Sequence, residues 1–195
     1  FKLKNRKARI SGEDNFIKSS ILIPIIKDNN IPSLLFQIRA ENLLRQPNEI
    51  CFPGGGIEKD EAPINTSIRE TSEELCIPPE NIHIIGASDT LFTPHNNLIY
   101  TFVGILNDYN GTFNEEVKEV FTVPLAFLFN AEPLCHYTSI TIEPEENFPF
   151  QMIQNGQNYK WGKGRNPVYF YTYKNKVIWG ITARIIYDFI NLIKT

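Results

Sequence analysis

One short segment contains charged residues close enough together to form a chemical site: Arg69, Glu70, Glu73 and Glu74. A helix over this segment, at 100° per residue, places the three glutamates together, away from an apolar stripe that begins at Ile64. Glu70 and Glu74 then repel one another across one helical turn, and no lysine one turn later balances their charge. Glu73 and Glu74 also lie near the negative end of the helix dipole, which disfavours negative charge. Each effect costs from a few tenths to about 1 kcal/mol.

A divalent cation would remove these costs together. Mg²⁺ and Mn²⁺ are hard cations that take carboxylate oxygens and keep further positions for water and phosphate. The glutamates therefore predict a site for Mg²⁺ or Mn²⁺. A solvated acidic face without a ligand is the alternative, and the helix alone does not decide between the two.

Three consecutive glycines, Gly54, Gly55 and Gly56, lie a few residues before this helix. Without side chains, the backbone can approach a ligand closely and can aim a carbonyl at a metal or amides at a phosphate. A tight turn is the alternative, but it needs one or two glycines and leaves the third unexplained. The glycines therefore favour a ligand site beside the carboxylates.

The elements that position these groups follow from hydrophobic patterning. Strands are predicted at Ser20–Ile26, Ser33–Arg39, Ile50–Phe52, His83–Ser88, Ile99–Leu106 and Glu119–Val123, and a hairpin at Val168–Tyr173 and Val177–Trp179. Helical spacing predicts the glutamate helix, ending before Pro78, and a last helix capped by Thr182. Glu143–Phe150 is expected to be a long surface loop. Strands outnumber helices, so we expect an α/β fold with a mixed sheet covered by helices, in one domain spanning 1–195.

The composition excludes several classes of protein. The net charge of -3 argues against a nucleic-acid partner, which needs a surplus of Lys and Arg. The longest apolar run, Ile21–Ile26, is too short to span a bilayer, so no membrane partner is expected. Cys51, Cys76 and Cys135 form no CxxC pair, which favours a reducing compartment and a cytoplasmic location.

The segment from Gly55 to Ile77 resembles the Nudix box. Its matching positions are Gly55, Glu61, Arg69-Glu70, Glu73-Glu74 and Ile77, whereas Thr71 replaces an aliphatic residue and Cys76 replaces a glycine. The resemblance implies a Nudix-type α/β/α sandwich with a mixed β-sheet. It also implies hydrolysis of a diphosphate by water activated on Mg²⁺ or Mn²⁺.

The same resemblance assigns roles to the residues of the box. Glu70, Glu73 and Glu74 would bind the metal, with the backbone carbonyl of Gly55 as a further ligand. Arg69 and Glu61 would pair and hold the loop against the helix, with Gly54 and Gly56 supporting that loop. The catalytic base would be one of the glutamates or one from a later loop, for which Glu116 is preferred over Glu115 and Glu119. An ordinary exposed carboxylate is the alternative at position 116.

The segment from Leu35 to Gly55 resembles the extra motif of coenzyme A diphosphatases. It matches at Leu35, Arg39 and Phe52-Pro53-Gly54-Gly55, and it departs at Gln37, Ala40, Leu44 and Asn48. The segments that begin at Glu115 and at Val177 also resemble that subfamily. The resemblance therefore runs from about Ser20 to Ile193. It implies cleavage of coenzyme A or acyl-CoA into 3′,5′-ADP and a 4′-phosphopantetheine, with Arg39, Arg45 and Phe52 binding substrate. Surface ion pairing is the alternative for both arginines.

Two other functions remain open at this stage. One is a Nudix hydrolase of ADP-ribose, NADH or another nucleoside diphosphate derivative. The four departures from the coenzyme A diphosphatase motif favour this function slightly. The other is a nucleotide-binding module without turnover, against which the complete set of glutamates speaks. In each case the partner is a small nucleoside diphosphate compound, and a homodimer stays open.

Overall fold

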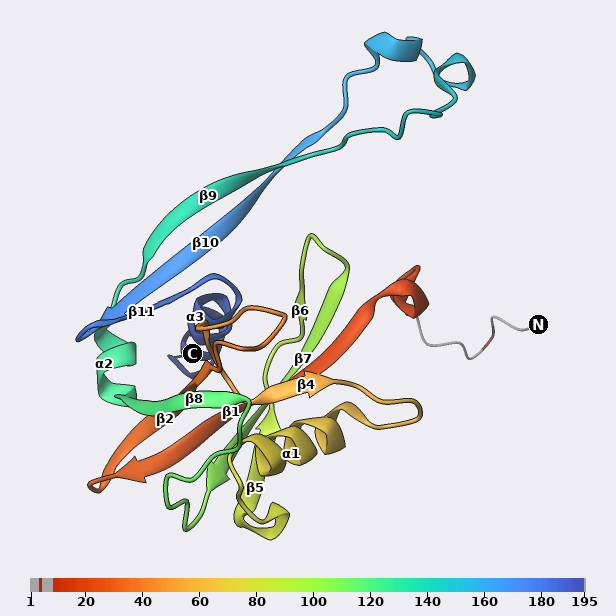
Figure 1. Ribbon diagram of the computed structural model, residues 1–195. Coiled ribbons are helices and arrows are strands. Elements are labelled where there is room, and N and C mark those ends of the chain that lie inside the picture. Colours follow the sequence, from red (N-terminus) through yellow and green to blue (C-terminus); the bar gives the residue numbers. More distant parts are fainter. Residues whose placement is uncertain (1–3, 5–8, 195) are drawn as a thin grey trace.

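The computed structural model describes residue 4 and residues 9–194, and its main feature is an eight-stranded mixed sheet (Figure 1). The strands of this sheet are β1 (Ile17–Asp28), β2 (Ile31–Arg39), β3 (Ile50–Cys51), β4 (Gly54–Gly56), β5 (Ile82–Ala87), β6 (Leu91–Phe92), β7 (Asn97–Leu106) and β8 (Val117–Pro124). β1 lies at the centre, parallel to β7 and antiparallel to β2 and β4. The pairing of β1 with β4 fixes the glycines against the central strand.

Helices cover both faces of the main sheet. α1 (Pro63–Glu74) covers one face, and α3 (Gly180–Lys194) covers the other (Figure 1). Because strand side chains alternate between the faces, Leu22 of β1 packs under α1, whereas Ile23 packs under α3. The α/β class with a mixed sheet between helices is thus confirmed.

A second sheet of three strands, in the order β11-β10-β9, packs against α3. Its strands are β9 (Leu134–Thr141), β10 (Lys163–Tyr173) and β11 (Lys176–Trp179), and it follows a short helix, α2 (Leu125–Asn130). β9 and β10 form a long hairpin arm that projects away from the main sheet (Figure 1). Tyr171 and Ile178 join the α3 core, so α3 lies between the two sheets.

Short 3-10 helices occupy four connections of the described chain. They are Glu13–Asn15, Pro79–Asn81, Phe150–Met152 and Gly156–Asn158. The last two lie in the segment that joins β9 to β10, which contains the whole of the predicted surface loop. In the part of the chain described, no helix is both long and apolar enough to cross a membrane.

The structure differs from the predicted elements at several places. β4, β6, α2 and β9 were not predicted, and Thr182 is not a helix cap. α3 begins two residues earlier, at Gly180, whose φ is 66°. The Thr182 hydroxyl instead donates to the Ile50 carbonyl at 2.9 Å and ties α3 to β3.

Candidate active site

The α1 segment buries most of its predicted apolar stripe, since Thr71 and Leu75 are fully buried and Ile68 packs against the core, but polar groups share this face. Its buried residues are Thr66, Ser67, Thr71 and Glu74. Ile64 is 37% exposed, whereas Glu74 is 3% exposed, so the prediction that all three glutamates face outward is wrong. Glu73 is exposed and Glu70 is half-buried. The stripe is incomplete because hydroxyl side chains and the Glu74 carboxylate are buried beside Leu75.

The Glu74 carboxylate is bound to the glycine strand. Its Oε2 accepts the backbone N–H of Gly54 at 2.9 Å. Burial raises the pKa of Glu74 to about 7, while the bond from Gly54 and a hydrogen bond with the Gln37 side chain act in the opposite direction. Glu74 is thus a buried carboxylate poised between its charged and neutral forms.

Glu70 lies directly against the backbone of Gly55. A Cβ atom on Gly55 would stand 2.3 Å from Cδ of Glu70, closer than real side chains come. Burial raises the pKa of Glu70, and the negative charges of Glu73 and Glu116 raise it further, while Arg69 lowers it. A side chain at position 55 would therefore displace the Glu70 carboxylate, which occupies that space.

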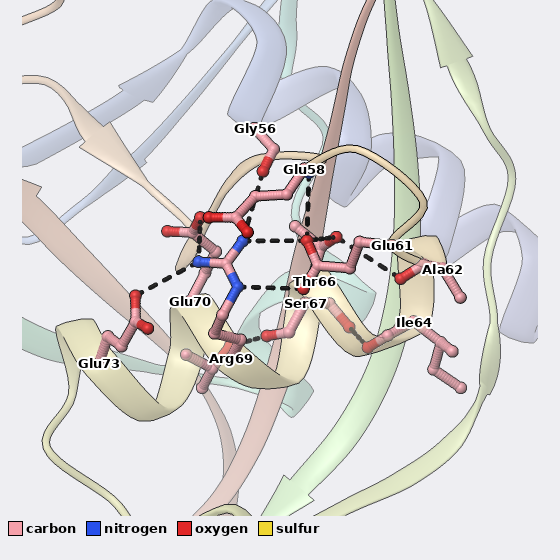
Figure 2. A network of polar contacts seen from close by, with 11 residues as sticks. Gly56, Glu58, Glu61, Ala62, Ile64, Thr66, Ser67, Arg69, Glu70 and Glu73 are labelled. Atoms are coloured by element: carbon pink, nitrogen blue, oxygen red, sulfur yellow. Dashed lines mark hydrogen bonds and ion pairs between the residues drawn. The ribbon is translucent and has the colours of Figure 1, made fainter.

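Arg69 links the glutamates on the outer side of α1 (Figure 2). Its guanidinium contacts Glu70 at 2.9 Å and Glu73 at 3.3 Å. A cation from the same helix thus lies between Glu70 and Glu73, whereas the expected repulsion between Glu70 and Glu74 remains and contributes to the raised pKa of Glu74. Arg69 also donates to the Gly56 carbonyl at 3.4 Å, which gives the third glycine a place in the network.

Glu61 holds the other side of the Arg69 guanidinium. Arg69 Nε lies 3.0 Å from Glu61 Oε1, and Nη2 lies 3.1 Å from Oε2 (Figure 2). The hydroxyl of Thr66 donates to the same carboxylate at 2.7 Å. The bonds from Arg69 and Thr66 lower the pKa of Glu61 to about 2. This bidentate pair ties the loop before α1 to the helix itself.

The first and third glycines of β4 meet different constraints. At Gly54, φ is 152°, and a Cβ atom would stand 2.3 Å from the Ser20 carbonyl oxygen of β1. At Gly56, nothing lies within 4 Å of the place that a Cβ atom would take. Gly54 and Gly55 thus lie where a side chain would collide, with β1 in the first case and with Glu70 in the second.

The C-terminal end of α1 forms despite the two departures from the box. Cys76, which replaces glycine, takes a left-handed φ of 47°, and the N–H of Ile77 donates to the Ser72 carbonyl at 3.2 Å. These are the features of a helix stop for which glycine is normally preferred. Thr71 satisfies its buried hydroxyl by donating to the Ser67 carbonyl at 2.6 Å.

The loop before β8 brings Glu116 to the carboxylate cluster. The N–H of Asn114 donates to the Glu74 carbonyl at 2.9 Å, and its side chain accepts the N–H of Glu116 at 2.9 Å. Glu116 is exposed, and its charge acts on Glu70. Glu119, a rival for the role of base, is instead paired with Lys176 at 2.7 Å.

A cavity of about 970 Å³ lies next to the glycine strand. Gly54, Gly55, Phe52 and Arg39 line one side, and residues of the arm, of the β6 region and of α3 line the others. Phe52 is 4% exposed and stacks on Phe36 with ring centroids 4.7 Å apart, so it supports the cavity from the core. The cavity is large enough for a nucleotide-sized ligand.

The two arginines of the upstream segment are placed differently. Arg39 lies at a register shift between β2 and β8, lines the cavity, and its positive charge acts on Glu74. Arg45 is exposed and does not line the cavity; its carbonyl accepts the Nε of Arg39 at 3.2 Å. Asn48 has a φ of 61°, which explains how this position dispenses with the family's glycine.

Sequence reasoning missed several residues of the site. Gln37 is 1% exposed and hydrogen-bonds Glu74. Its polar side chain within the apolar strand Ser33–Arg39 is the feature of the sequence that could have identified it. Trp179 and Ile140 line the cavity from β11 and β9. No local pattern assigns these two to the site, because the arm brings them there through the tertiary fold.

The oxygen-rich donor set fits a hard divalent cation in type. The charges of Glu73 and Glu116 act on Glu70, and the charge of Glu70 acts on Glu74. The buried Gln37 Oε1 has no hydrogen-bond partner among the described residues. Within residue 4 and residues 9–194, however, no three His, Cys, Asp or Glu side chains are arranged to hold a metal as they stand. The reasons are visible: Glu74 is bound to Gly54, and Arg69 occupies Glu70 and Glu73.

A solved structure supports the fold. The MutT/nudix family protein from Enterococcus faecalis superposes with a TM-score of 0.54 at 14% identity, covering 97% of this chain and 66% of that chain. At 14% identity this likeness shows the fold, a mixed sheet covered by helices.

Sequence comparison gives the family. The NUDIX domain matches residues 18–137. "Uncharacterized Nudix hydrolase NudL" from Pectobacterium atrosepticum is 30% identical over 174 residues, covering 88% of this chain and 80% of that protein. The protein of the same description from Yersinia pestis (strain Pestoides F) is 32% identical over 173 residues, covering 87% and 76%. The chain belongs to the Nudix hydrolase family.

Proposed function

We propose that this enzyme hydrolyses the diphosphate bond of coenzyme A or acyl-CoA and releases 3′,5′-ADP and a 4′-phosphopantetheine. One observation carries this proposal. The segment that resembles the coenzyme A diphosphatase motif, Leu35–Gly55, supplies one side of the 970 Å³ cavity, including Arg39 and Gly55. A motif that only stabilised the fold would not need to line a cavity beside the carboxylates.

Mg²⁺ or Mn²⁺ would be held by Glu70, Glu73, Glu74 and the carbonyl of Gly55. Such an ion neutralises charge on the diphosphate and activates water. Glu70 and Glu74 resist full ionisation in its absence because they are buried. Their raised pKa values are the physical sign of a site that favours a positive ligand.

Glu116 takes the proton from the attacking water in this proposal. It is exposed, it belongs to a loop tied to α1, and its charge acts on Glu70. Neither Lys nor Arg forms an ion pair with Glu116 in the described part of the chain, in contrast to Glu119. An unpaired carboxylate is free to accept a proton.

Arg39 binds the phosphates, and Arg69 with Glu61 positions the helix. Arg39 lines the cavity that Gly55 also lines, and a guanidinium group binds two phosphate oxygens at once. Arg69 forms a bidentate pair with Glu61, and its contact with Glu70 holds that carboxylate in place. For Arg45, which is outside the cavity, we propose only that its backbone fixes Arg39.

Product analysis tests the substrate. Purified protein is incubated with Mg²⁺ or Mn²⁺ and with coenzyme A, acyl-CoA, ADP-ribose, NADH or a dinucleotide, and the products are separated by chromatography. We expect coenzyme A or its acyl form to be cleaved fastest. If ADP-ribose or NADH is cleaved much faster, the substrate assignment is wrong and the second function, hydrolysis of those compounds, takes its place.

Two pairs of variants test the residues. Glu73→Gln is expected to lower turnover by several orders of magnitude with the fold intact, whereas Glu80→Gln, an exposed carboxylate just beyond α1, leaves it unchanged. Glu116→Gln is expected to lower kcat by about 10²- to 10⁴-fold, and Glu115→Gln is its control. An unchanged rate in Glu73→Gln would remove the proposed metal site.

A further inference from the structure

The cavity contains an aromatic side chain that the proposed hydrolysis does not use. Trp179, the last residue of β11, lines the cavity and is 51% exposed. Tryptophan offers a large flat surface, and half of it is left uncovered here. Exposed aromatic area inside a concave site is typical of ligand recognition.

The Trp179 ring is held in place before any ligand arrives. It stacks on Phe170, its partner across the β10–β11 pair, with an interplanar angle of 10° and a centroid separation of 6.1 Å. Gly180 follows with a φ of 66° and turns the chain directly into α3. A ring fixed by its strand, its neighbour and the following helix loses little entropy on binding.

The same cavity joins Trp179 to Arg39 and to the glycine strand, which separates the cavity from the glutamates. Its lining includes Arg39, Gly54 and Gly55, and Gly55 contacts Glu70. A ligand whose diphosphate lies at Gly55 and Arg39 can therefore extend through one continuous space toward Trp179. This geometry suits a molecule with a charged centre and a planar end.

We propose that Trp179 is the platform on which the nucleobase of the substrate stacks. The proposal rests on the proposed function, since it requires a nucleotide substrate. A nucleobase is the planar group that nucleoside diphosphate derivatives share, and its π-face stacks on tryptophan without base-specific hydrogen bonds. Trp179 then binds and orients the nucleoside, while the carboxylates act on the diphosphate.

A protein partner is the competing explanation for the exposed ring. Leu134 is 63% exposed and Val177 is 50% exposed, and both lie on the same face of the second sheet as Trp179. Neither of them lines the cavity, however. The position of Trp179 inside the cavity therefore favours the nucleobase.

Fluorescence tests the stacking without turnover. The chain has two tryptophans, Trp161 and Trp179, so Trp161→Phe leaves Trp179 as the reporter. ADP is expected to quench its emission in a saturable way, and inorganic pyrophosphate is expected to leave it unchanged. Absence of ADP binding in calorimetry, or binding without quenching, would overturn the proposal. The titration is carried out without Mg²⁺ or Mn²⁺, so its outcome is independent of which substrate the enzyme cleaves.

Kinetics test the same residue during catalysis. Trp179→Ala should raise KM for coenzyme A about tenfold with kcat nearly unchanged, and Trp179→Phe should restore most of the affinity. Val177→Ala, on the same sheet face but outside the cavity, is the control and should match wild type. An unchanged KM in Trp179→Ala would overturn the proposal, and a smaller assembly than wild type in light scattering would then assign the ring to a protein interface.

Discussion

The glycine strand with α1 and the β9–β10 arm are stabilised in different ways. Around α1, charged and polar groups bond to one another across β4, the preceding loop and the helix (Figure 2). In the arm, seven of the eight β9 residues are exposed, and the ring contacts at its tip join only neighbours within the tip. Catalytic geometry therefore depends on a tightly constrained region, whereas the arm can vary and still line the cavity.

Gly55→Ala should have the largest effect, because it breaks the constrained region at its closest contact. The new Cβ would stand 2.3 Å from Glu70 Cδ and displace the carboxylate. We expect kcat/KM to fall about 10²-fold, as misplacement by about 1 Å can cause. The measurement is a steady-state assay with a thermal melt to confirm folding.

Gly56→Ala is the matched control for this substitution. A Cβ at Gly56 meets nothing within 4 Å, and its carbonyl contact to Arg69 uses only the backbone. Most of the activity should remain. Equal losses in the two variants would contradict the role assigned to the contact between Gly55 and Glu70.

The pH dependence of stability should report on Glu74. Its pKa of about 7 in the folded state lies above the ordinary 4.5, so the folded chain keeps a proton that the unfolded chain releases. This contribution is fully present below pH 4.5 and is lost as the pH rises through about 7. Between these limits the metal-free protein should lose about 3 kcal/mol of unfolding free energy from this group.

Denaturant unfolding at several pH values measures this loss. Glu74→Gln removes the titrating group and should flatten the curve between pH 4.5 and 7, whereas Glu80→Gln should not. A steep wild-type curve that is unchanged in Glu74→Gln would assign the effect to another group.

Cys76→Gly should stabilise the same region modestly. Cys76 occupies a left-handed conformation, with φ of 47°, which costs a residue with a side chain about 1 kcal/mol relative to glycine. We expect Tm to rise by a few degrees with unchanged activity. A fall in Tm would mean that packing of the Cys76 side chain outweighs its backbone strain.

Phe148→Ala, in the tip of the arm, should have the smallest effect. The Phe148 ring contacts Phe150 and Trp161 within the tip, with centroids 5.0 and 5.5 Å apart. Tm should stay within about 1 °C, because no core contact is lost. A large decrease in Tm, measured by calorimetry, would show that the tip is coupled to the main sheet and that the two regions do not differ as described.

The sequence predicts the central elements because their patterns are strong. Strands around Ser20–Ile26 and Ile99–Leu106 carry β-branched runs, and the box spacing places α1. β4 escapes prediction because three glycines have little strand propensity, and its pairing with β1 comes from the tertiary fold. β9 escapes because both of its faces are exposed, which leaves no alternation to detect.

The candidate site is predicted in its residue types but not in its arrangement. The spacing of Glu70, Glu73 and Glu74 indicates a common site, yet the burial of Glu74 depends on its bond to Gly54 in another element. The pairing of Arg69 with Glu61 agrees with what the resemblance implies, whereas the contact of Arg69 with Glu70 needs side-chain geometry that a helical wheel does not contain. Long-range contacts of this kind determine the charge states of the site.

Calorimetric titration with Mn²⁺ tests most directly whether the carboxylates around the glycine strand hold a divalent cation. Wild type should bind the ion saturably, Glu70→Gln should bind it at least about tenfold more weakly, and Glu80→Gln should match wild type. Absence of saturable binding in wild type, or equal affinity in wild type and Glu70→Gln, would contradict the assignment of this cluster as the metal site.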